Sequence, residues 1–286
     1  MNNWDWMEPY GVLIAGLLAV LLLIVLKKKL GERKKAPEPL ELPSDIEIGN
    51  AQTKGRRQEQ DDYFASAATK LGTMAVIADG ISGLANGRMS STLAVTVFTQ
   101  EFMKVGSIRD IEEYFHRAAA VSNRSIIEQL GGAHGGTTLV AAVVSQGLLH
   151  WGAVGDSMIL LFRDGEFMAV NSKHTLETVL EQQYLAGQIS REEARENPKR
   201  NQLINYLGYE GFKSMEIGEP IQLRKDDIVL LCSDGVYDAL TEVELEQILM
   251  RRQPPQDTAE AIIDYIEGKS YKHQDNATVM ILEKGW

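Results

Sequence analysis

The chain has 286 residues, of which 29 are lysine or arginine and 40 are aspartate or glutamate, giving a formal net charge of -11. Its 44% hydrophobic and 24% charged residues are typical of a folded protein, and the acidic balance argues against a general nucleic-acid binder. The single cysteine excludes a disulfide framework within the chain and a multi-cysteine zinc site.

An uncharged apolar run occupies residues 10–26, close to the start of the chain. Its 17 residues would extend roughly 26 Å as a helix, near the short end of the length that crosses a bilayer. A buried core helix and a signal peptide are the alternatives. However, the run has no polar face, and Asp5 and Glu8 precede it without any lysine or arginine. We therefore expect a retained transmembrane helix at 10–26, with residues 1–9 as a short extracytoplasmic N-terminus.

Basic residues follow this run directly, at Lys27, Lys28, Lys29, Arg33, Lys34 and Lys35. Lysine and arginine collect on the cytoplasmic flank of membrane helices, so the remainder of the chain is expected in the cytoplasm. Residues 36–44 contain three prolines and predict a stiff, extended linker. The chain is thus expected at the cell membrane as a single-pass protein, with a basic and then proline-rich linker at 27–44 and a folded domain at 45–286.

The folded domain alternates short apolar runs with segments of helical spacing. Strands are expected at 73–78, 138–144, 148–154, 158–162, 166–170, 228–232 and 277–282, and helices at 88–105, 111–130, 175–186, 190–196, 242–251 and 257–267. Asp164-Gly165 is a hairpin turn signal. The connections among the strands at 138–162 are too short for parallel crossovers, so these strands are expected to be antiparallel. The pattern predicts an α+β domain built on antiparallel sheet.

Aspartates recur at the ends of the expected strands, beside glycine, serine or asparagine. Ordinary turn chemistry explains any one of them, because aspartate and glycine are both favoured in turns. Several that converge at one end of a sheet would instead suit a hard cation such as Mg²⁺ or Mn²⁺. The five histidines show no zinc-ligand spacing. The aspartates concerned are Asp79, Asp156, Asp234 and Asp275, together with the acidic pair Asp61-Asp62.

Six short motifs in order give the domain a resemblance to a known family. They are RRQEQD at 56–61, DGISG at 79–83, GGTT at 135–138, GDS at 155–157, SDG at 233–235 and DN at 275–276. Together they resemble the metal-dependent protein serine/threonine phosphatases of the PPM (PP2C) type over nearly all of residues 45–286. The segment 172–208 is similar to the flap of the bacterial branch.

The resemblance implies a fold, a reaction and partners. The fold would be a PP2C-like sandwich of two antiparallel β-sheets flanked by helices, beside the transmembrane helix. The reaction would be hydrolysis of phosphoserine and phosphothreonine by a hydroxide held between two Mg²⁺ or Mn²⁺ ions. The partners would be phosphorylated protein substrates and a serine/threonine kinase acting in the opposite sense. A PP2C-fold scaffold that binds phosphoproteins with little catalysis, and a phosphatase for small phosphate esters, remain the alternatives.

The resemblance also assigns roles to individual residues. Asp79 would bridge both metal ions, and Asp234 and Asp275 would complete the ligands of the first. The carbonyl of Gly80 would bind the second ion. Asp61 would hold metal-bound water, Asp156 with Asp234 would form a third and weaker metal site, and Arg56 would bind the substrate phosphate. Arg57 is adjacent to Arg56, so this last assignment has an uncertainty of one residue.

Three positions depart from the family pattern. Ile81 stands where many eukaryotic members have a histidine proposed as general acid, so the leaving oxygen must take its proton from another source. Met158 replaces a usual arginine and Glu59 a common asparagine. The expected metal-binding aspartates are all present, which argues against an inactive enzyme. Cys232 is interpreted as a small buried hydrophobe at a strand end, not as a nucleophile.

Overall fold

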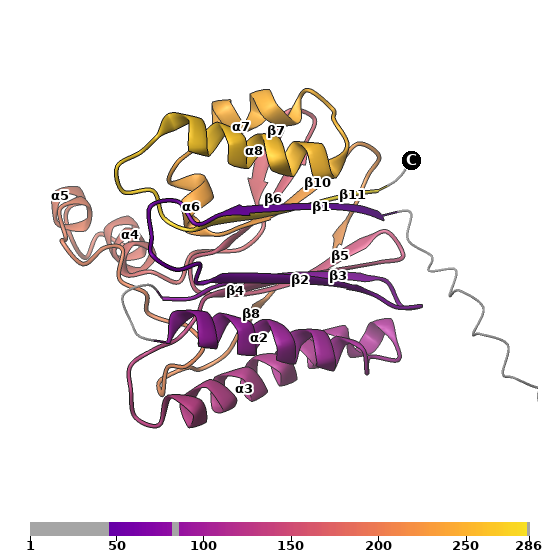
Figure 1. Ribbon diagram of the computed structural model, residues 1–286. Helices are drawn as coiled ribbons and strands as arrows, with labels where there is room; N and C mark the ends of the chain where they lie inside the picture. The colour runs from indigo at the N-terminus through magenta and orange to yellow at the C-terminus, as the bar shows by residue number, and fades with distance from the viewer. Residues whose placement is uncertain (1–45, 82–85, 285–286) are drawn as a thin grey trace, which may run out of the picture. The chain divides into compact units, whose positions relative to one another are not determined.

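The computed structural model describes residues 46–81 and 86–284, and it has the expected α+β architecture (Figure 1). Two antiparallel sheets lie face to face, and helices cover the outer face of each. The predicted N-terminus at 1–9, transmembrane helix at 10–26 and linker at 27–44 lie outside the described residues. None of the helices in the described part of the chain is long and apolar enough to cross a membrane.

The first sheet contains the two ends of the described domain. Its strands lie in the order β1 (Ile46–Thr53), β11 (Ala277–Lys284), β10 (Ile228–Cys232), β6 (Met158–Arg163) and β7 (Glu166–Ala169). The first and last strands pair along their full length, from Ile46 opposite Lys284 to Thr53 opposite Ala277. The helices α6 (Asp234–Tyr237), α7 (Glu242–Leu249) and α8 (Pro255–Lys269) lie on its outer side (Figure 1).

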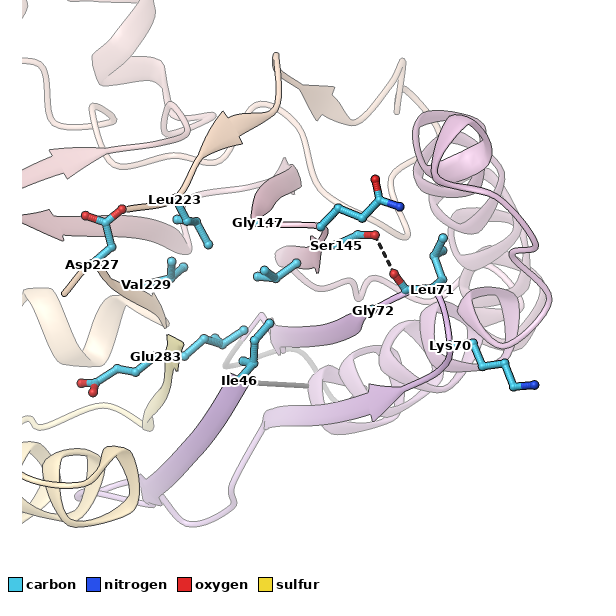
Figure 2. Close-up of a pocket in the computed structure, with 13 residues that line it drawn as sticks. Ile46, Lys70, Leu71, Gly72, Ser145, Gly147, Leu223, Asp227, Val229 and Glu283 are labelled. Carbon is cyan, nitrogen blue, oxygen red and sulfur yellow. Dashed lines mark hydrogen bonds between the residues drawn. The ribbon is translucent and has the colours of Figure 1, made fainter. Parts of the chain in front are cut away.

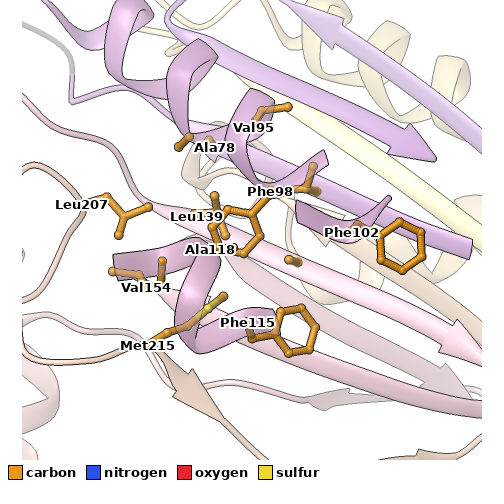
Figure 3. Packing of buried hydrophobic residues seen from close by; sticks show 14 of the residues in the cluster. Ala78, Val95, Phe98, Phe102, Phe115, Ala118, Leu139, Val154, Leu207 and Met215 are labelled. Carbon is orange, nitrogen blue, oxygen red and sulfur yellow. The ribbon is translucent and has the colours of Figure 1, made fainter. Parts of the chain in front are cut away.

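The second sheet is formed from the middle of the chain. Its strands lie in the order β2 (Asp62–Ala68), β3 (Thr73–Asp79), β4 (Leu139–Ser145), β5 (Leu148–Val154) and β8 (Glu216–Ile217), and β9 (Ile221–Gln222) also pairs with β5. Its outer face is covered by α2 (Gly87–Phe102) and α3 (Ile111–Leu130), which follows the 3-10 turn Ile108–Asp110. Aromatic side chains such as Phe98, Phe102 and Phe115 fill the space between these helices and the sheet (Figure 3).

The central strands are apolar along their whole length because both of their faces are covered. In β3, Ala75 and Ile77 belong to the core between the sheets, whereas Met74, Val76 and Ala78 belong to the core under α2 and α3. This alternation is the two-residue period of a strand applied to two separate cores. The uninterrupted apolar run at 73–78 therefore identified a central strand.

The hairpin and the flap follow local sequence signals. Asp164 and Gly165 both have positive φ, of 55° and 86°, as a two-residue hairpin turn between β6 and β7 requires. The helices α4 (Leu176–Leu185) and α5 (Arg191–Arg195) form the segment that resembles a flap. They lie beyond the end of the sandwich at which α6 begins (Figure 1). Ser190 and Glu193 form a capping box that starts α5.

Some elements were not predicted. The strands β1 and β2 lack a continuous apolar run, because β1 is an edge strand and several of their side chains are partly exposed. The strands β8 and β9 have two residues each, which is too short for a periodic signal. The short helix α6 begins at Asp234, where the sequence predicted only a strand end.

Candidate active site

The predicted site aspartates come from both sheets and meet at one end of the sandwich. Asp79 is the last residue of β3, and Asp62 is its direct partner at the start of β2. Asp234 follows β10, and Asp275 precedes β11, which is the neighbour of β10. Asp156 lies in the turn between β5 and β6. The antiparallel order of both sheets therefore brings together residues that are far apart in the chain.

Burial and mutual repulsion raise the pKa values of these carboxyl groups. The pKa of Asp79 lies well above its ordinary value, chiefly because burial disfavours the charged form, and Asp62, Asp234 and Asp156 raise it further. The pKa of Asp234 is raised to about 7, first by burial and then by Asp156 and Asp275. Such a group of carboxyls is costly to ionise without a compensating cation.

Asp62 connects the two sheets. Its Oδ2 accepts hydrogen bonds from the hydroxyl of Ser233, at 2.8 Å, and from the hydroxyl of Thr278, at 2.7 Å. Its Oδ1 is buried and has no hydrogen-bond partner among the described residues. Burial raises the pKa of Asp62 to about 6, although both hydroxyl groups lower it. An unpartnered carboxylate oxygen in such a place fits a nearby cation.

The carboxyl groups have the chemistry of a hard-cation site. Within 46–81 and 86–284, no three histidine, cysteine, aspartate or glutamate side chains are arranged to hold a metal ion. The donor atoms, charge and burial of Asp79 and Asp234 fit Mg²⁺ or Mn²⁺.

Gly80 has no room for a side chain. A Cβ atom there would lie 2.4 Å from the backbone of Gly87 and 2.8 Å from the carbonyl oxygen of Asp61. The Gly80 N–H donates to that same carbonyl oxygen at 3.2 Å. Glycine is therefore required for the close approach of the chain after β3 to the start of α2. Ser82 and Gly83, the end of the DGISG motif, lie outside the described residues.

Asn276 holds the RRQEQD segment against the start of β11. Its Oδ1 accepts from the N–H of Asp61 at 2.8 Å, and its Nδ2 donates to the carbonyl oxygens of Lys54 and Glu59, each at 2.9 Å. Ser91 also donates to the carbonyl oxygen of Asp61, at 2.5 Å. The backbone of Asp61 is thus fixed from two sides, beside Gly80.

The two arginines of the RRQEQD segment differ in their surroundings. The Nη2 of Arg57 lies 2.5 Å from Oδ2 of Asp275. The backbone N–H of Arg56 donates to Gln274, and its side chain lines a hollow with Glu267 of α8. Arg57 is therefore the arginine that contacts a site carboxylate. The phosphate contact predicted for Arg56 remains a prediction.

The GGTT and GDS motifs support the backbone of Asp79. The Thr137 hydroxyl donates to the carbonyl oxygen of Asp79 at 2.7 Å, and the N–H of Asp79 donates to Oγ1 of Thr138 at 3.3 Å. Thr138 and Ser157 share a hydrogen bond of 2.7 Å between their hydroxyls. Gly155 has φ of 95°, and a Cβ there would lie 2.6 Å from Thr138. These residues position Asp79, and their hydroxyls are already engaged.

Cys232 is a packing residue. It is almost completely buried in the core beneath α7 and α8. Burial raises the pKa of its thiol to about 12, so the thiolate that a nucleophile needs is not formed at neutral pH. The interpretation of Cys232 as a buried hydrophobe is consistent with this environment.

Sequence reasoning assigned no role to Asp62, Lys173 or Tyr237. Asp62 was noted only as the neighbour of Asp61, and its importance depends on its register opposite Asp79. Lys173 and Tyr237 lie in different segments and meet only in the fold, where the Lys173 ammonium stands over the Tyr237 ring. The acidic pair at 61–62 was the one local signal that could have indicated Asp62.

A separate cavity of about 470 Å³ lies at the other end of the sandwich, between the two sheets (Figure 2). Its walls include Ile46, Val144, Val229 and Leu282, with Glu283 at its rim. None of the predicted site residues lines it. The cluster of carboxyl groups therefore defines the candidate active site.

Comparisons with known proteins agree with the fold and the motifs. The family model described as protein phosphatase 2C matches residues 48–265. The serine/threonine phosphatase stp of Listeria innocua is 28% identical over 218 residues, which cover 73% of this chain and 83% of that protein.

Solved structures of phosphatases show the same fold. The serine/threonine phosphatase of S. agalactiae matches with a TM-score of 0.73 and 24% identity, covering 83% of this chain and 98% of that one. The catalytic domain of the phosphatase PstP in complex with two manganese ions matches with a TM-score of 0.68 and 23% identity, covering 83% and 97%. The sandwich, the ordered motifs and the family match lead to one conclusion: the chain belongs to the protein phosphatase 2C family and is a protein serine/threonine phosphatase.

Proposed function

We propose that the chain hydrolyses phosphoserine and phosphothreonine in proteins with the help of two divalent cations, Mg²⁺ or Mn²⁺. The observation that carries this proposal is the meeting of Asp79 with Asp234 and Asp275, from two different sheets, in a chain of this family. The PstP domain that shares the fold is in complex with two manganese ions, which supports the choice of cation. When bound, such cations supply a water of lowered pKa and neutralise charge on the phosphoryl oxygens.

The proposed ligands are the ones implied by the motifs. Asp79 would lie between the two cations, with Asp234 and Asp275 on one side and the carbonyl oxygen of Gly80 on the other. Asp61 would orient water beside Gly80. The backbone of Asp79 accepts a hydrogen bond from the Thr137 hydroxyl and donates one to Oγ1 of Thr138, and these two bonds fix the direction from which its carboxyl enters the site.

An arginine of the RRQEQD segment would bind the substrate phosphate. The planar fork of a guanidinium matches two phosphate oxygens, so it orients phosphate as well as attracting it. The contact between Arg57 and Asp275 supports Arg57 for this task, while the motif supports Arg56. Either side chain would act only by binding and orientation.

We propose that the substrates are proteins phosphorylated by a serine/threonine kinase. The name of the Listeria relative, a serine/threonine phosphatase, supports this choice. The exposed segment containing α4 and α5 would contribute to substrate binding, because it lies beyond the end of the sandwich where the carboxyl groups meet.

The test compares substrates and metal conditions on the full-length chain purified in mild detergent. Phosphate release from a phosphothreonine peptide is measured with Mn²⁺, with a chelator, and beside p-nitrophenyl phosphate as a small ester. We expect release from the peptide that requires Mn²⁺ and a higher kcat/KM for the peptide. Full activity in chelator would contradict the metal mechanism. Peptide binding without hydrolysis would favour the scaffold alternative.

We also propose that residues 10–26 anchor the chain in the cell membrane with the catalytic domain in the cytoplasm. The uncharged apolar run and the basic residues that follow it support this topology. A reporter fused after Trp286 should give a cytoplasmic signal and fractionate with membranes. An extracellular signal, or a soluble fusion, would contradict the proposal.

A further inference from the structure

Lys173 places a positive charge at the edge of the acidic site. Its Nζ lies 3.5 Å from the centroid of the Tyr237 ring, and its side chain is partly buried. The hydroxyl of Tyr237 in turn donates to the backbone carbonyl of Asp156 at 3.1 Å. An ammonium over an aromatic ring is held by the negative charge of the ring face. Tyr237 therefore fixes the lysine next to the turn that carries Asp156.

The backbone around Lys173 is fastened to the same turn. The N–H of His174 donates to the carbonyl oxygen of Gly155 at 2.8 Å, and the N–H of Gly155 donates to Nδ1 of His174 at 3.2 Å. The carbonyl oxygen of Lys173 accepts from the Thr178 hydroxyl at 2.7 Å. These reciprocal bonds hold Lys173 close to Asp156 independently of the side-chain contact.

The charge of Lys173 acts on two carboxyl groups. The ammonium of Lys173 and the carboxylate of Asp156 attract each other across the turn that Tyr237 contacts. Burial raises the pKa of Asp238 above its ordinary value, and the positive charge of Lys173 opposes that rise. The ammonium thus already compensates the negative charge at the Asp156 side of the site.

We propose that the ammonium of Lys173 is a built-in cation that takes the place of a third divalent ion beside Asp156. The inference rests on the proposed two-cation centre and deepens it. A dication beside Asp156 would approach the ammonium closely and be repelled by it, while Asp156 would gain little from a second positive neighbour. The chain therefore holds two divalent ions at this site, and Lys173 sets that number.

The number of Mn²⁺ ions bound per chain tests the proposal directly. Equilibrium dialysis with elemental analysis is performed on the full-length protein in detergent. The variants are Lys173→Met, which removes the charge and keeps most of the volume, and Lys173→Arg, which keeps the charge. Lys225→Met is the matched control, because Lys225 is an exposed lysine on the loop before β10.

The wild type, Lys173→Arg and Lys225→Met should each bind two Mn²⁺ ions. Lys173→Met should bind a third Mn²⁺ ion. Its affinity for that third ion should be at least about tenfold higher than the affinity of the wild type for a third ion. Adding Asp156→Asn to Lys173→Met should remove that third ion. Lys173→Gln serves as a second neutral variant, and thermal unfolding shows which neutral variant is folded.

Three ions on the wild type, or an unchanged ion count and affinity in a folded neutral variant, would overturn the proposal. Failure of the proposed function is distinguishable, because it would appear as absence of phosphate release by the wild type itself. The difference in bound Mn²⁺ between the wild type and the neutral variants concerns Lys173 alone.

Discussion

The carboxyl group of Asp62, in the second sheet, accepts a hydrogen bond at 2.8 Å from the hydroxyl of Ser233, which directly follows β10 of the first sheet. Asp62 begins β2 opposite Asp79, and Ser233 directly precedes Asp234. One buried contact therefore sets the separation between the proposed metal ligand of the second sheet and that of the first. The catalytic site and the stacking of the two sheets depend on the same residue.

Replacing Asp62 should weaken both folding and metal binding. Asp62→Ala leaves the hydroxyls of Ser233 and Thr278 without their acceptor, so we expect a loss of about 1–3 kcal/mol in the free energy of unfolding. Because Asp62 would support the metal ligands, Mn²⁺ affinity should fall by about 10- to 100-fold. Urea unfolding and Mn²⁺ titration calorimetry measure the two effects.

Asp62→Asn keeps one carbonyl oxygen that can accept from both hydroxyls, so its loss of stability should be smaller than that of Asp62→Ala. Asp264→Ala is the matched control, because Asp264 is exposed on α8. Wild-type stability and wild-type Mn²⁺ affinity in Asp62→Ala would contradict the role assigned to Asp62.

The metal-free protein should lose stability as pH rises from about 4 to about 7. The pKa values of Asp62 and Asp234 are raised in the folded protein, to about 6 and about 7. The folded state therefore holds more protons than the unfolded state across this window, and folding weakens as these protons are lost. Urea unfolding in chelator between pH 4.5 and 7.5 measures the slope.

Two comparisons isolate the cause of this pH dependence. Asp234→Asn should flatten the slope, because the amide does not titrate in this range. Saturating Mn²⁺ should restore stability most at the upper end of the window, where the carboxyl groups are ionised. A slope that is unchanged in Asp234→Asn would show that other groups govern the pH dependence.

Gly80→Ala should damage the site and the fold, because the new Cβ would lie 2.4 Å from the backbone of Gly87. Such overpacking costs about 1–3 kcal/mol, and it displaces the Gly80 carbonyl from the proposed metal position. We expect lower stability in urea unfolding and weaker Mn²⁺ binding in calorimetry.

Gly268→Ala is the control for this prediction. Gly268 lies in α8, and a Cβ there would meet no atom within 4 Å. Alanine in a helix should raise the free energy of unfolding by about 0.4–1 kcal/mol and leave Mn²⁺ binding unchanged. Equal effects of the two substitutions would mean that the crowding around Gly80 has no functional consequence.

Arg57→Ala should impair phosphopeptide turnover more than Arg56→Ala. The Arg57 guanidinium already stands beside Asp275, and its loss removes a charged partner for phosphate. We expect KM for a phosphothreonine peptide to rise about tenfold in Arg57→Ala, equivalent to about 1.4 kcal/mol of binding. Steady-state kinetics of both variants shows whether Arg57, which contacts Asp275 in the structure, or Arg56, which the motif assigns, binds the substrate phosphate. A larger defect in Arg56→Ala would restore the assignment made from the sequence.

The sequence predicted those parts of the fold that have a strong local signal. The apolar runs of β3 and β10 and the Asp164-Gly165 turn identified buried strands and a hairpin. The six ordered motifs predicted a two-sheet sandwich, which the structure confirms. The edge strand β1 was missed because most of its side chains are partly or fully exposed, so it has no continuous apolar run.

The parts of the site that escaped prediction depend on tertiary structure. The contact of Asp62 with Ser233 and Thr278 joins residues separated by 171 and 216 positions. The contact of Lys173 with Tyr237 likewise joins the flap to α6. Adjacent arginines 56 and 57 cannot be distinguished by spacing alone, and only the fold shows which one turns towards Asp275.

The most direct test of the central claim is the rate of phosphate release by Asp79→Asn with saturating Mn²⁺ and a phosphothreonine peptide. Loss of the carboxylate that would lie between the two cations should remove several kcal/mol of transition-state stabilisation, so kcat/KM should fall at least about a hundredfold. Asp264→Asn, an exposed aspartate of α8, should retain the wild-type rate. A folded Asp79→Asn variant that releases phosphate as fast as the wild type would contradict the account.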